Sequence, residues 1–155
     1  MEIVELSERK DILEEAIRYF WECWGHDNDF LFYKDFIEHS IDLQTALPRF
    51  YLAISKSQII GTYALLTNDL VSRQDLVPWF ACLFVSEPFR NQGIAGKLLA
   101  HGLQEASLKG FEQLYLCTDL DNFYEKKGWS YLSKGYNPMG GKVKIYNHKL
   151  KEKAL

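Results

Sequence analysis

A short segment of the sequence combines two cations with three positions that carry little or no side chain. Arg90 stands before the segment and Lys97 after it, and between them lie Gly93, Ala95 and Gly96. A glycine-containing turn between a strand and a helix directs unpaired backbone N–H groups and the positive end of the helix dipole toward one point. Such a point binds anions, phosphates above all. We therefore expect this segment to hold a phosphate compound.

Two common phosphate-binding motifs do not fit the segment. A mononucleotide P-loop needs glycine five residues before Gly96 and a hydroxyl residue after Lys97, but the sequence has Asn91 and Leu98 there. The dinucleotide fingerprint needs the spacing G-x-G-x-x-G and an acidic partner about 20 residues on after a second strand. Gly93-Ile94-Ala95 has only the first glycine, and the acidic partner after a second strand is missing. What remains is Arg-x-x-Gly-x-Ala after an apolar run, or an ordinary tight strand-to-helix turn.

The composition limits the classes of protein to consider. The 155 residues are 47% hydrophobic with a net charge of -3, which predicts a single globular domain, residues 1–155, that does not bind nucleic acid. Three distant cysteines and four scattered histidines indicate neither a disulfide framework nor a metal site, so we expect no metal. The start MEIVELSERK lacks a signal-peptide layout, and no apolar run approaches the length of about 20 residues that spans a bilayer. We expect a soluble, cytoplasmic protein without a membrane partner.

The apolar patterns predict the elements that must position the segment. They are a strand over Glu2–Leu6, a helix capped by Ser7 and ended by Gly25, a second helix after Asn28, a hairpin over Arg49–Thr67 that turns at Ser55–Ser57, an apolar strand over Val77–Val85, a helix that ends at Gly110, the strand FEQLYLCT, a short helix capped by Asp119 or Asp121 and ended by Gly128, and the strands WSYL and GKVKIYNHKL. This order predicts an α/β domain around a mixed sheet.

Two segments together resemble the GNAT superfamily of N-acyltransferases. LFVSEPFRNQGIAGKLL is similar to the family's pyrophosphate loop for acetyl-coenzyme A (acetyl-CoA), and LYLCTDLDNFYEKKGWSYL is similar to its second signature. Their order and separation also match, so the resemblance covers nearly the whole chain. It implies a mixed, mostly antiparallel twisted sheet of about seven strands and four flanking helices, with a splayed central pair of strands.

The resemblance implies a set of residues at acetyl-CoA. They are Leu83, Phe84, Val85, Arg90, Asn91, Gln92, Gly93, Ile94, Ala95, Gly96, Lys97, Thr118, Asn122 and Lys127. Backbone groups of Leu83 and Val85 would hold the pantetheine arm, and N–H groups of 91–96 the pyrophosphate. Cys117 stands where the family commonly has Asn, so Thr118 or Asn122 is expected to supply that hydrogen bond. Lys127 either meets the 3′-phosphate or is a solvated surface lysine.

The chemistry of acyl transfer needs an acid, an oxyanion site and a base. The resemblance places Tyr124 near the thioester sulfur, where it would protonate the departing thiolate, although a core tyrosine is the alternative. A backbone N–H near Leu83 could serve as the oxyanion hole. The strand Trp79–Val85 contains no acid, so the base stays unassigned, and a water chain to some carboxylate would serve. The apolar neighbours of Cys82 argue against an acyl-cysteine route.

The acceptor pocket is expected from the segment WECWGHDNDFLFY and from strand ends. The candidates are Trp24, Asp27, Asp29 and Trp79, with Tyr136 nearby. Aromatic faces and carboxylates suit a cationic amine. Alternatively, the tryptophans face the core and the acids cap the next helix.

The sequence thus favours an N-acetyltransferase that moves acetyl from acetyl-CoA to a primary amine of a small molecule or peptide, directly in a ternary complex. A non-catalytic acyl-CoA-binding module of the same fold is the alternative, because the strand glutamate is missing. A domain that binds nothing is a third, weaker interpretation. A homodimer is also an option, since the final strand, GKVKIYNHKL, would offer an edge.

Overall fold

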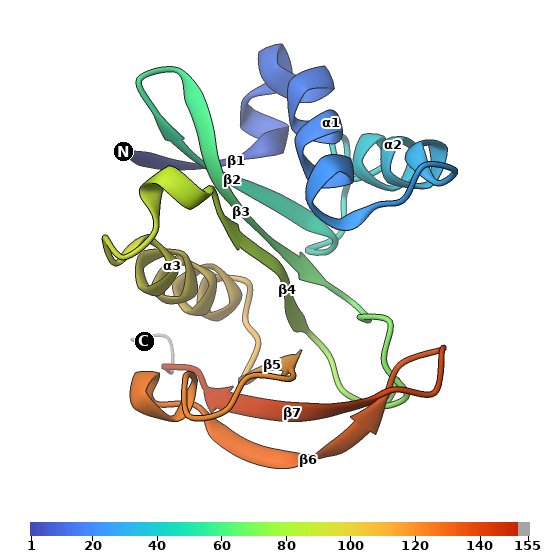
Figure 1. The fold of residues 1–155 in the computed structure, drawn as a ribbon, viewed down its shortest axis with the longest axis vertical. Helices are drawn as coiled ribbons and strands as arrows, with labels where there is room; N and C mark the ends of the chain where they lie inside the picture. The colour runs from blue at the N-terminus through green and yellow to red at the C-terminus, as the bar shows by residue number, and fades with distance from the viewer. Residues whose placement is uncertain (152–155) are drawn as a thin grey trace. The chain divides into compact units, whose positions relative to one another are not determined.

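The computed structural model describes residues 1–151, and this part of the chain contains three α-helices and seven strands. The helices are α1 (Leu13–Trp24), α2 (Phe30–Glu38) and α3 (Ile94–Leu108). The strands are β1 (Glu2–Glu5), β2 (Arg49–Ser55), β3 (Gln58–Leu66), β4 (Trp79–Val85), β5 (Gln113–Thr118), β6 (Ser130–Tyr136) and β7 (Lys142–Lys149). Figure 1 traces them along the chain. Within the described residues, no helix is both long and apolar enough to cross a membrane.

Hydrogen bonds connect the seven strands in the order β1-β2-β3-β4-β5-β7-β6. Strands β1 and β2, β5 and β7, and β6 and β7 pair antiparallel, whereas β4 and β5 pair in parallel with Trp79 opposite Tyr115. The expected mixed α/β sheet is thereby confirmed. The expectation that the final strand offers an edge was wrong, because β7 has a partner on each side; β1 and β6 are the outer strands. A homodimer stays a prediction.

The chain forms two compact units. Unit 1 consists of Met1–Ala64 and Cys82–His101, and unit 2 consists of Leu65–Ala81 and the chain from Gly102 on. Each unit takes part of β3, β4 and α3, since these elements cross the boundaries. The single-domain organisation expected from the sequence stays a prediction.

Unit 1 contains α1, α2 and the β2–β3 hairpin, with α1 and α2 side by side in Figure 1. The hairpin turns at Lys56 and Ser57, whose left-handed backbone (φ 50° and 63°) matches the twist of the two strands. The helices bury one apolar face each, and Phe20 and Phe36 both contact the Phe50 ring edge-on at 5.2 Å. The hairpin and both helices were predicted from the apolar pattern.

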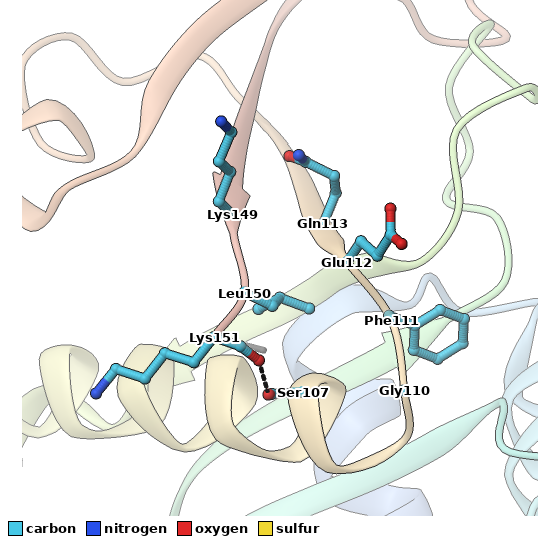
Figure 2. A pocket seen from close by; sticks show the side chains of 8 residues that line it. All are labelled: Ser107, Gly110, Phe111, Glu112, Gln113, Lys149, Leu150 and Lys151. Carbon is cyan, nitrogen blue, oxygen red and sulfur yellow. Dashed lines mark hydrogen bonds between the residues drawn. The ribbon is translucent and has the colours of Figure 1, made fainter. Parts of the chain in front are cut away.

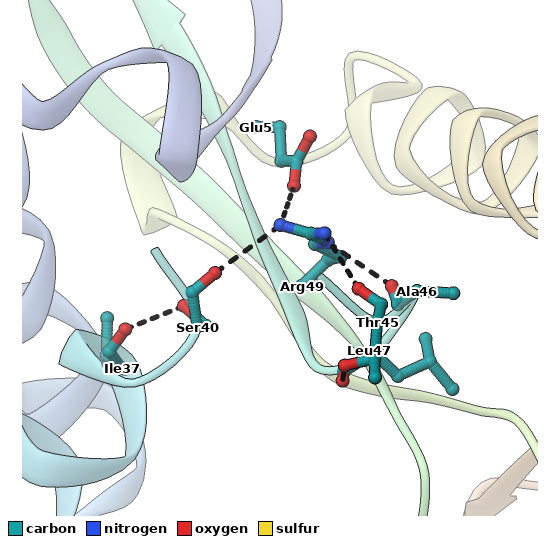
Figure 3. A network of polar contacts seen from close by, with 7 residues as sticks. All are labelled: Glu5, Ile37, Ser40, Thr45, Ala46, Leu47 and Arg49. Atoms are coloured by element: carbon teal, nitrogen blue, oxygen red, sulfur yellow. Dashed lines mark hydrogen bonds and ion pairs between the residues drawn. The ribbon is translucent and has the colours of Figure 1, made fainter. Parts of the chain in front are cut away.

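A polar network centred on Arg49 closes the connection from α2 to β2 (Figure 3). The Arg49 guanidinium donates to the backbone carbonyls of Ser40, Thr45 and Ala46 and pairs with Glu5 at 3.3 Å. Both side chains of the ion pair are largely buried. The segment between α2 and β2 has no secondary structure of its own. Its backbone conformation is fixed because the Arg49 guanidinium bonds three of its carbonyls.

In unit 2 the connection from β3 to β4, residues 67–78, packs against the hairpin formed by β6 and β7. We call this connection the docked loop. Ser72 exchanges hydrogen bonds with Tyr136, donating N–H to its carbonyl (2.8 Å) and accepting its N–H on Oγ (3.0 Å). Val71 is buried, and a Cβ added to Gly135 would lie 3.0 Å from it and 2.7 Å from Ile145. A larger residue at 135 would therefore require Ile145 or Val71 to shift.

Two predicted helix details were wrong. The fourth helix is a single 3₁₀ turn, Glu125–Lys127, because Asn122 adopts a left-handed backbone (φ 62°) and the Thr118 hydroxyl accepts the Leu120 N–H. The described chain thus has three α-helices where four were expected. Ser7 does not cap α1 either: it lies in a 3₁₀ turn, Leu6–Glu8, and α1 begins at Leu13.

Candidate functional site

The segment from Arg90 to Lys97, which we call the glycine turn, has the geometry of an anion site. Asn91 and Gly93 are left-handed (φ 64° and 79°), and α3 begins at Ile94 with its first bond from the Lys97 N–H to the Gly93 carbonyl. The N–H groups before this bond have no partner within the helix. A Cβ built on Gly93 would meet nothing within 4 Å. Gly93 is therefore required for its left-handed backbone and not for lack of space, since the surface beside it is open.

Arg90 is anchored to the end of β4. Its Nε donates to the Val85 carbonyl at 2.8 Å, and its guanidinium carbon lies 5.5 Å from the centre of the Phe84 ring. Gln92 donates to the Pro88 carbonyl at 3.4 Å, and Lys97 is exposed. Two predicted cofactor residues, Arg90 and Phe84, are therefore held together within unit 1, with the positive charge at the mouth of the glycine turn.

The second half of β4 departs from a regular strand. Cys82 has a left-handed backbone (φ 58°), a conformation typical of β-bulges, and we call this point the bulge. The completely buried Thr62 donates its hydroxyl to the Cys82 carbonyl at 2.8 Å. A Cβ added to the neighbouring Gly61 would lie 2.9 Å from the Phe84 carbonyl, so β3 approaches β4 very closely here. Leu83, Phe84 and Val85 follow the bulge and are half-buried.

Some residues of the predicted acceptor segment are exposed, and others are held in structural hydrogen bonds. Trp24 is 38% exposed and contacts the Phe84 ring edge-on at 6.4 Å. Asp29 accepts the His26 N–H at 2.6 Å and the Trp21 Nε1–H at 3.1 Å, and the first of these bonds is the main cause that lowers its pKa. Asp29 thus fastens the connection between α1 and α2, and its side chain makes no capping hydrogen bond to α2. The alternative, in which the acids cap that helix, stays a prediction, and Asp27 is exposed.

Trp79 is completely enclosed in unit 2. Its Nε1–H donates to the Leu76 carbonyl at 2.6 Å, and its ring lies 5.9 Å from that of Tyr115. The side chain has no exposed atoms to offer a substrate. Its burial instead fixes the start of β4 against β5, where the two strands pair.

Tyr124 lies just before the 3₁₀ turn of unit 2 and is 7% exposed. Its ring packs against Phe123, Trp129 and Tyr146, with centroids 4.9, 6.3 and 5.9 Å away. Burial, followed by the charge of Cys117, raises the pKa of Tyr124 to about 12. The hydroxyl is therefore protonated at neutral pH, which is the form that an acid needs. Packing and an acid role are compatible at this position.

Cys117, whose charge influences Tyr124, contacts a carboxylate that sequence reasoning missed. The Cys117 thiol donates to Asp69 Oδ2 at 3.5 Å, and burial followed by the charge of Asp69 raises its pKa to about 12. The other oxygen, Oδ1, accepts the Leu70 N–H at 2.8 Å. We call Tyr124, Cys117 and Asp69 the Tyr124 cluster. No spacing in the sequence signals Asp69, because the docked loop that carries it has no regular structure.

The remaining predicted cofactor residues of unit 2 lie on the surface. Thr118 accepts the Leu120 N–H at 3.0 Å, Asn122 is exposed, and the exposed Lys127 lies 5.2 Å above the Phe123 ring. Thr118 retains its O–H for donation, so it is better placed than Cys117 to replace the missing Asn. The lysine keeps both of the interpretations given above.

A separate cavity of about 550 Å³ opens at the end of α3 (Figure 2). It is lined by Ser107, Gly110, Phe111, Glu112, Gln113, Lys149, Leu150 and Lys151. Across it, Ser107 Oγ donates to the Lys151 carbonyl at 2.8 Å, and the Leu150 N–H donates to the Glu112 carbonyl at 3.0 Å. It contains none of the residues that the motifs single out, and its contacts tie the end of β7 to α3.

Comparison with known proteins gives a consistent result. The model of the acetyltransferase (GNAT) family matches residues 10–129. No curated protein matches the sequence. Among solved structures, an aminoglycoside 6'-acetyltransferase type Ii is similar with a TM-score of 0.74 and 16% identity over 99% of this chain and 100% of that one.

Two similar structures contain the coenzyme. An aminoglycoside 6'-N-acetyltransferase complexed with coenzyme A has a TM-score of 0.69 and 17% identity, with both chains fully covered. A GNAT family acetyltransferase from Elizabethkingia anophelis with acetyl-CoA bound has a TM-score of 0.58 and 22% identity over 76% of this chain and 83% of that one. At these identities the likeness establishes the fold.

Proposed function

Because the chain belongs to the GNAT acetyltransferase family, we propose that it transfers the acetyl group of acetyl-CoA directly to a primary amine in a ternary complex. The observation that carries this proposal is the glycine turn, where the left-handed Gly93 opens the N-terminus of α3 to an anion. The pyrophosphate of acetyl-CoA would bind the N–H groups of residues 91–96, with Arg90 and Lys97 adding positive charge. Backbone groups of Leu83 and Val85, after the bulge in β4, would hold the pantetheine arm.

In the reaction the amine nitrogen attacks the thioester carbon, and the C–S bond then breaks. A backbone N–H of the Leu83 strand would stabilise the oxyanion, and Tyr124 would give its proton to the leaving thiolate. Burial raises the pKa of Tyr124 to about 12, so the hydroxyl holds its proton at neutral pH and can donate it when the thiolate forms.

For the acceptor we propose a cationic amine, recognised in part by the exposed face of Trp24. Glu22 and Asp27 are exposed on the same segment and can attract a cation. Two of the similar structures are named aminoglycoside acetyltransferases. Amino sugars are therefore the first acceptors to test, followed by polyamines and peptide amines.

The first test is isothermal titration of the protein with acetyl-CoA. We expect binding by the wild type and a loss of about a hundredfold or more in Gly93→Glu, because the substitution adds backbone strain and a negative charge beside the phosphates. Gly140→Glu is the matched control: Gly140 is also left-handed (φ 86°) with nothing within 4 Å of an added Cβ. Equal losses in both variants, or no binding by the wild type, would contradict the proposal.

The second step is coenzyme A release with a panel of kanamycin, spermidine, tyramine and a lysine-containing peptide. Release with one of them supports transfer. The absence of any carboxylate on β4 favours the alternative, a non-catalytic acyl-CoA-binding module. That alternative predicts binding of acetyl-CoA without amine-dependent release.

A further inference from the structure

We propose that Asp69 is the catalytic base of this reaction, taking the proton of the acceptor ammonium directly or through one water molecule. The proposal rests on the proposed acetyl transfer and supplies the group that β4 lacks. Asp69 stands three residues after the end of β3, and its Oδ2 accepts a hydrogen bond from the Cys117 thiol at 3.5 Å. Cys117 is in turn close enough to Tyr124 for the charge of one to act on the other. The carboxylate and the proposed acid therefore both interact with the same thiol, one by a hydrogen bond and the other electrostatically.

The other acids on the segments around Tyr124 are engaged elsewhere. The engaged acids are Asp75 with Arg73, Asp121 with Lys144, and Glu125 with the Tyr146 hydroxyl. Asp119 is exposed to solvent. Asp69 is half-buried, and within residues 1–151 no cation is paired with it. Its carboxylate has two donors, the Leu70 N–H and the Cys117 thiol, so lone pairs remain for an ammonium or a water.

The position of Asp69 is fixed although it lies in a loop. The Asp69 carbonyl accepts the Val71 N–H at 2.8 Å, and Gln74 Nε2 donates to the Val71 carbonyl at 2.6 Å. Farther along, Arg73 donates to Ser133 Oγ at 3.2 Å and Ser72 exchanges two bonds with Tyr136. The docked loop is thus fastened to β6 from Val71 onward. A base must be held in place to reach its proton, and this docking limits the movement of Asp69.

The proton balance is complete without a further reactant. The ammonium loses one proton to Asp69, and the nitrogen forms the C–N bond and then loses a second proton to water. The C–S electron pair leaves with sulfur, which takes the Tyr124 proton. The products are the acetamide, coenzyme A thiol, one proton released to solvent, a protonated Asp69 and a tyrosinate. One proton passes from Asp69 to Tyr124 through solvent, so that both recover their starting forms. Thiol Cys117, with its raised pKa, stays protonated throughout.

The first test uses the wild type and the fastest amine of the panel. Aspartates ordinarily ionise well below pH 6, and alkyl ammonium groups lose their proton only at about pH 9 to 10. If Asp69 removes the proton, kcat is flat between pH 6 and 8, because the ammonium from which it takes the proton is the major form of the amine throughout. If only neutral amine reacts, the rate rises about tenfold per pH unit. That slope in the wild type would overturn the proposal.

The second test is Asp69→Asn, whose amide oxygen can still accept the Leu70 N–H. We expect kcat to fall about a hundredfold or more at pH 6 and to rise about tenfold per pH unit, while acetyl-CoA binding changes less than twofold. Asp119→Asn, which removes an exposed charge from the same unit, should behave as the wild type. An Asp69→Asn enzyme with a raised KM for the amine but a flat kcat profile would make Asp69 an anchor and overturn its role as base.

Chemical rescue covers the case in which Asn at 69 does not fold. Added formate should restore activity to Asp69→Ala in a saturable way, since the small carboxylate can occupy the vacated space. A folded Asp69→Ala enzyme that binds acetyl-CoA but gains nothing from formate would count against the proposal. Wild-type protein that releases no coenzyme A with any amine would instead contradict the proposed transfer itself, so the two failures are distinguishable.

Discussion

The roles proposed for the glycine turn in unit 1 and the Tyr124 cluster in unit 2 both concern charge, but they use different parts of the chain. In the glycine turn, Asn91, Gln92 and Gly93 are exposed, and the groups proposed to bind the ligand are backbone N–H groups. In the Tyr124 cluster the groups proposed to act are side chains. Tyr124 is 7% exposed, and burial is the main cause that raises its pKa to about 12.

The difference follows from the two tasks. A phosphate arrives with its charge and keeps it, so fixed N–H dipoles at a helix end are sufficient and the side chains beside them matter little. A proton transfer requires an acid and a base with suitable pKa values. Burial and neighbouring charges set those pKa values. Substitutions should therefore act through backbone conformation in the glycine turn and through single side-chain atoms in the Tyr124 cluster.

Removing one oxygen from the Tyr124 cluster should give the largest effect among the variants that follow. We expect Tyr124→Phe to lower kcat about a hundredfold, because the thiolate loses its proton donor, while the affinity for acetyl-CoA changes less than twofold. In the wild type the tyrosine stays protonated up to about pH 12, so its ionisation should not lower kcat below pH 10. Steady-state coenzyme A release from pH 6 to 10 measures both effects.

The matched control is Tyr131→Phe, which removes a hydroxyl from a half-exposed tyrosine on β6 of the same unit. It should keep the wild-type rate. If Tyr124→Phe also kept that rate across the pH range, Tyr124 would be a packing residue, and the contrast between the two regions would lose its chemical basis.

Much of the fold was predictable because it depends on local patterns. The hairpin turn at Lys56 and Ser57, the apolar strand β4 and the helix after the glycine turn all follow from residue spacing. The 3₁₀ turn near Tyr124 did not, since one left-handed residue, Asn122, breaks a pattern that reads as helical. The central place of β7 also depends on long-range pairing that no local signal reports.

The candidate site divides in the same way. Glycine spacing indicates the glycine turn, because the backbone conformation there requires particular residue types. The contact of Asp69 with Cys117 joins segments 48 positions apart, and it arises from docking of an irregular loop through Val71 and Gly135. A carboxylate brought in by tertiary packing leaves no periodic trace in the sequence, so the base could not be assigned from it.

Thr62→Val tests whether the proposed acetyl-CoA site depends on the backbone conformation of β4. The variant keeps the shape of the side chain but removes the hydroxyl that donates to the Cys82 carbonyl at the left-handed position of β4. Loss of this buried bond should lower the free energy of unfolding by about 1–3 kcal/mol and weaken acetyl-CoA binding severalfold. Urea unfolding and titration measure these, and Thr62→Ser should restore both. Unchanged acetyl-CoA binding in Thr62→Val would show that the bulge does not shape the donor site.

Cys117→Ser tests the surroundings of the Tyr124 cluster through the pH dependence of the free energy of unfolding. The pKa of Cys117 is raised from 9.0 to about 12, so between these values the folded protein holds a proton that the unfolded chain has lost. The free energy of unfolding should therefore fall as the pH rises above 9, and this thiol should account for about 1 kcal/mol of the loss at pH 10. Serine can still donate to Asp69 but does not titrate there, so the variant should lose less stability between pH 7.5 and 10. Urea unfolding at the two pH values gives the difference.

Equal losses of stability in the wild type and in Cys117→Ser would mean that Cys117 titrates normally. The surroundings that keep Tyr124 protonated would then be more solvated than its burial indicates.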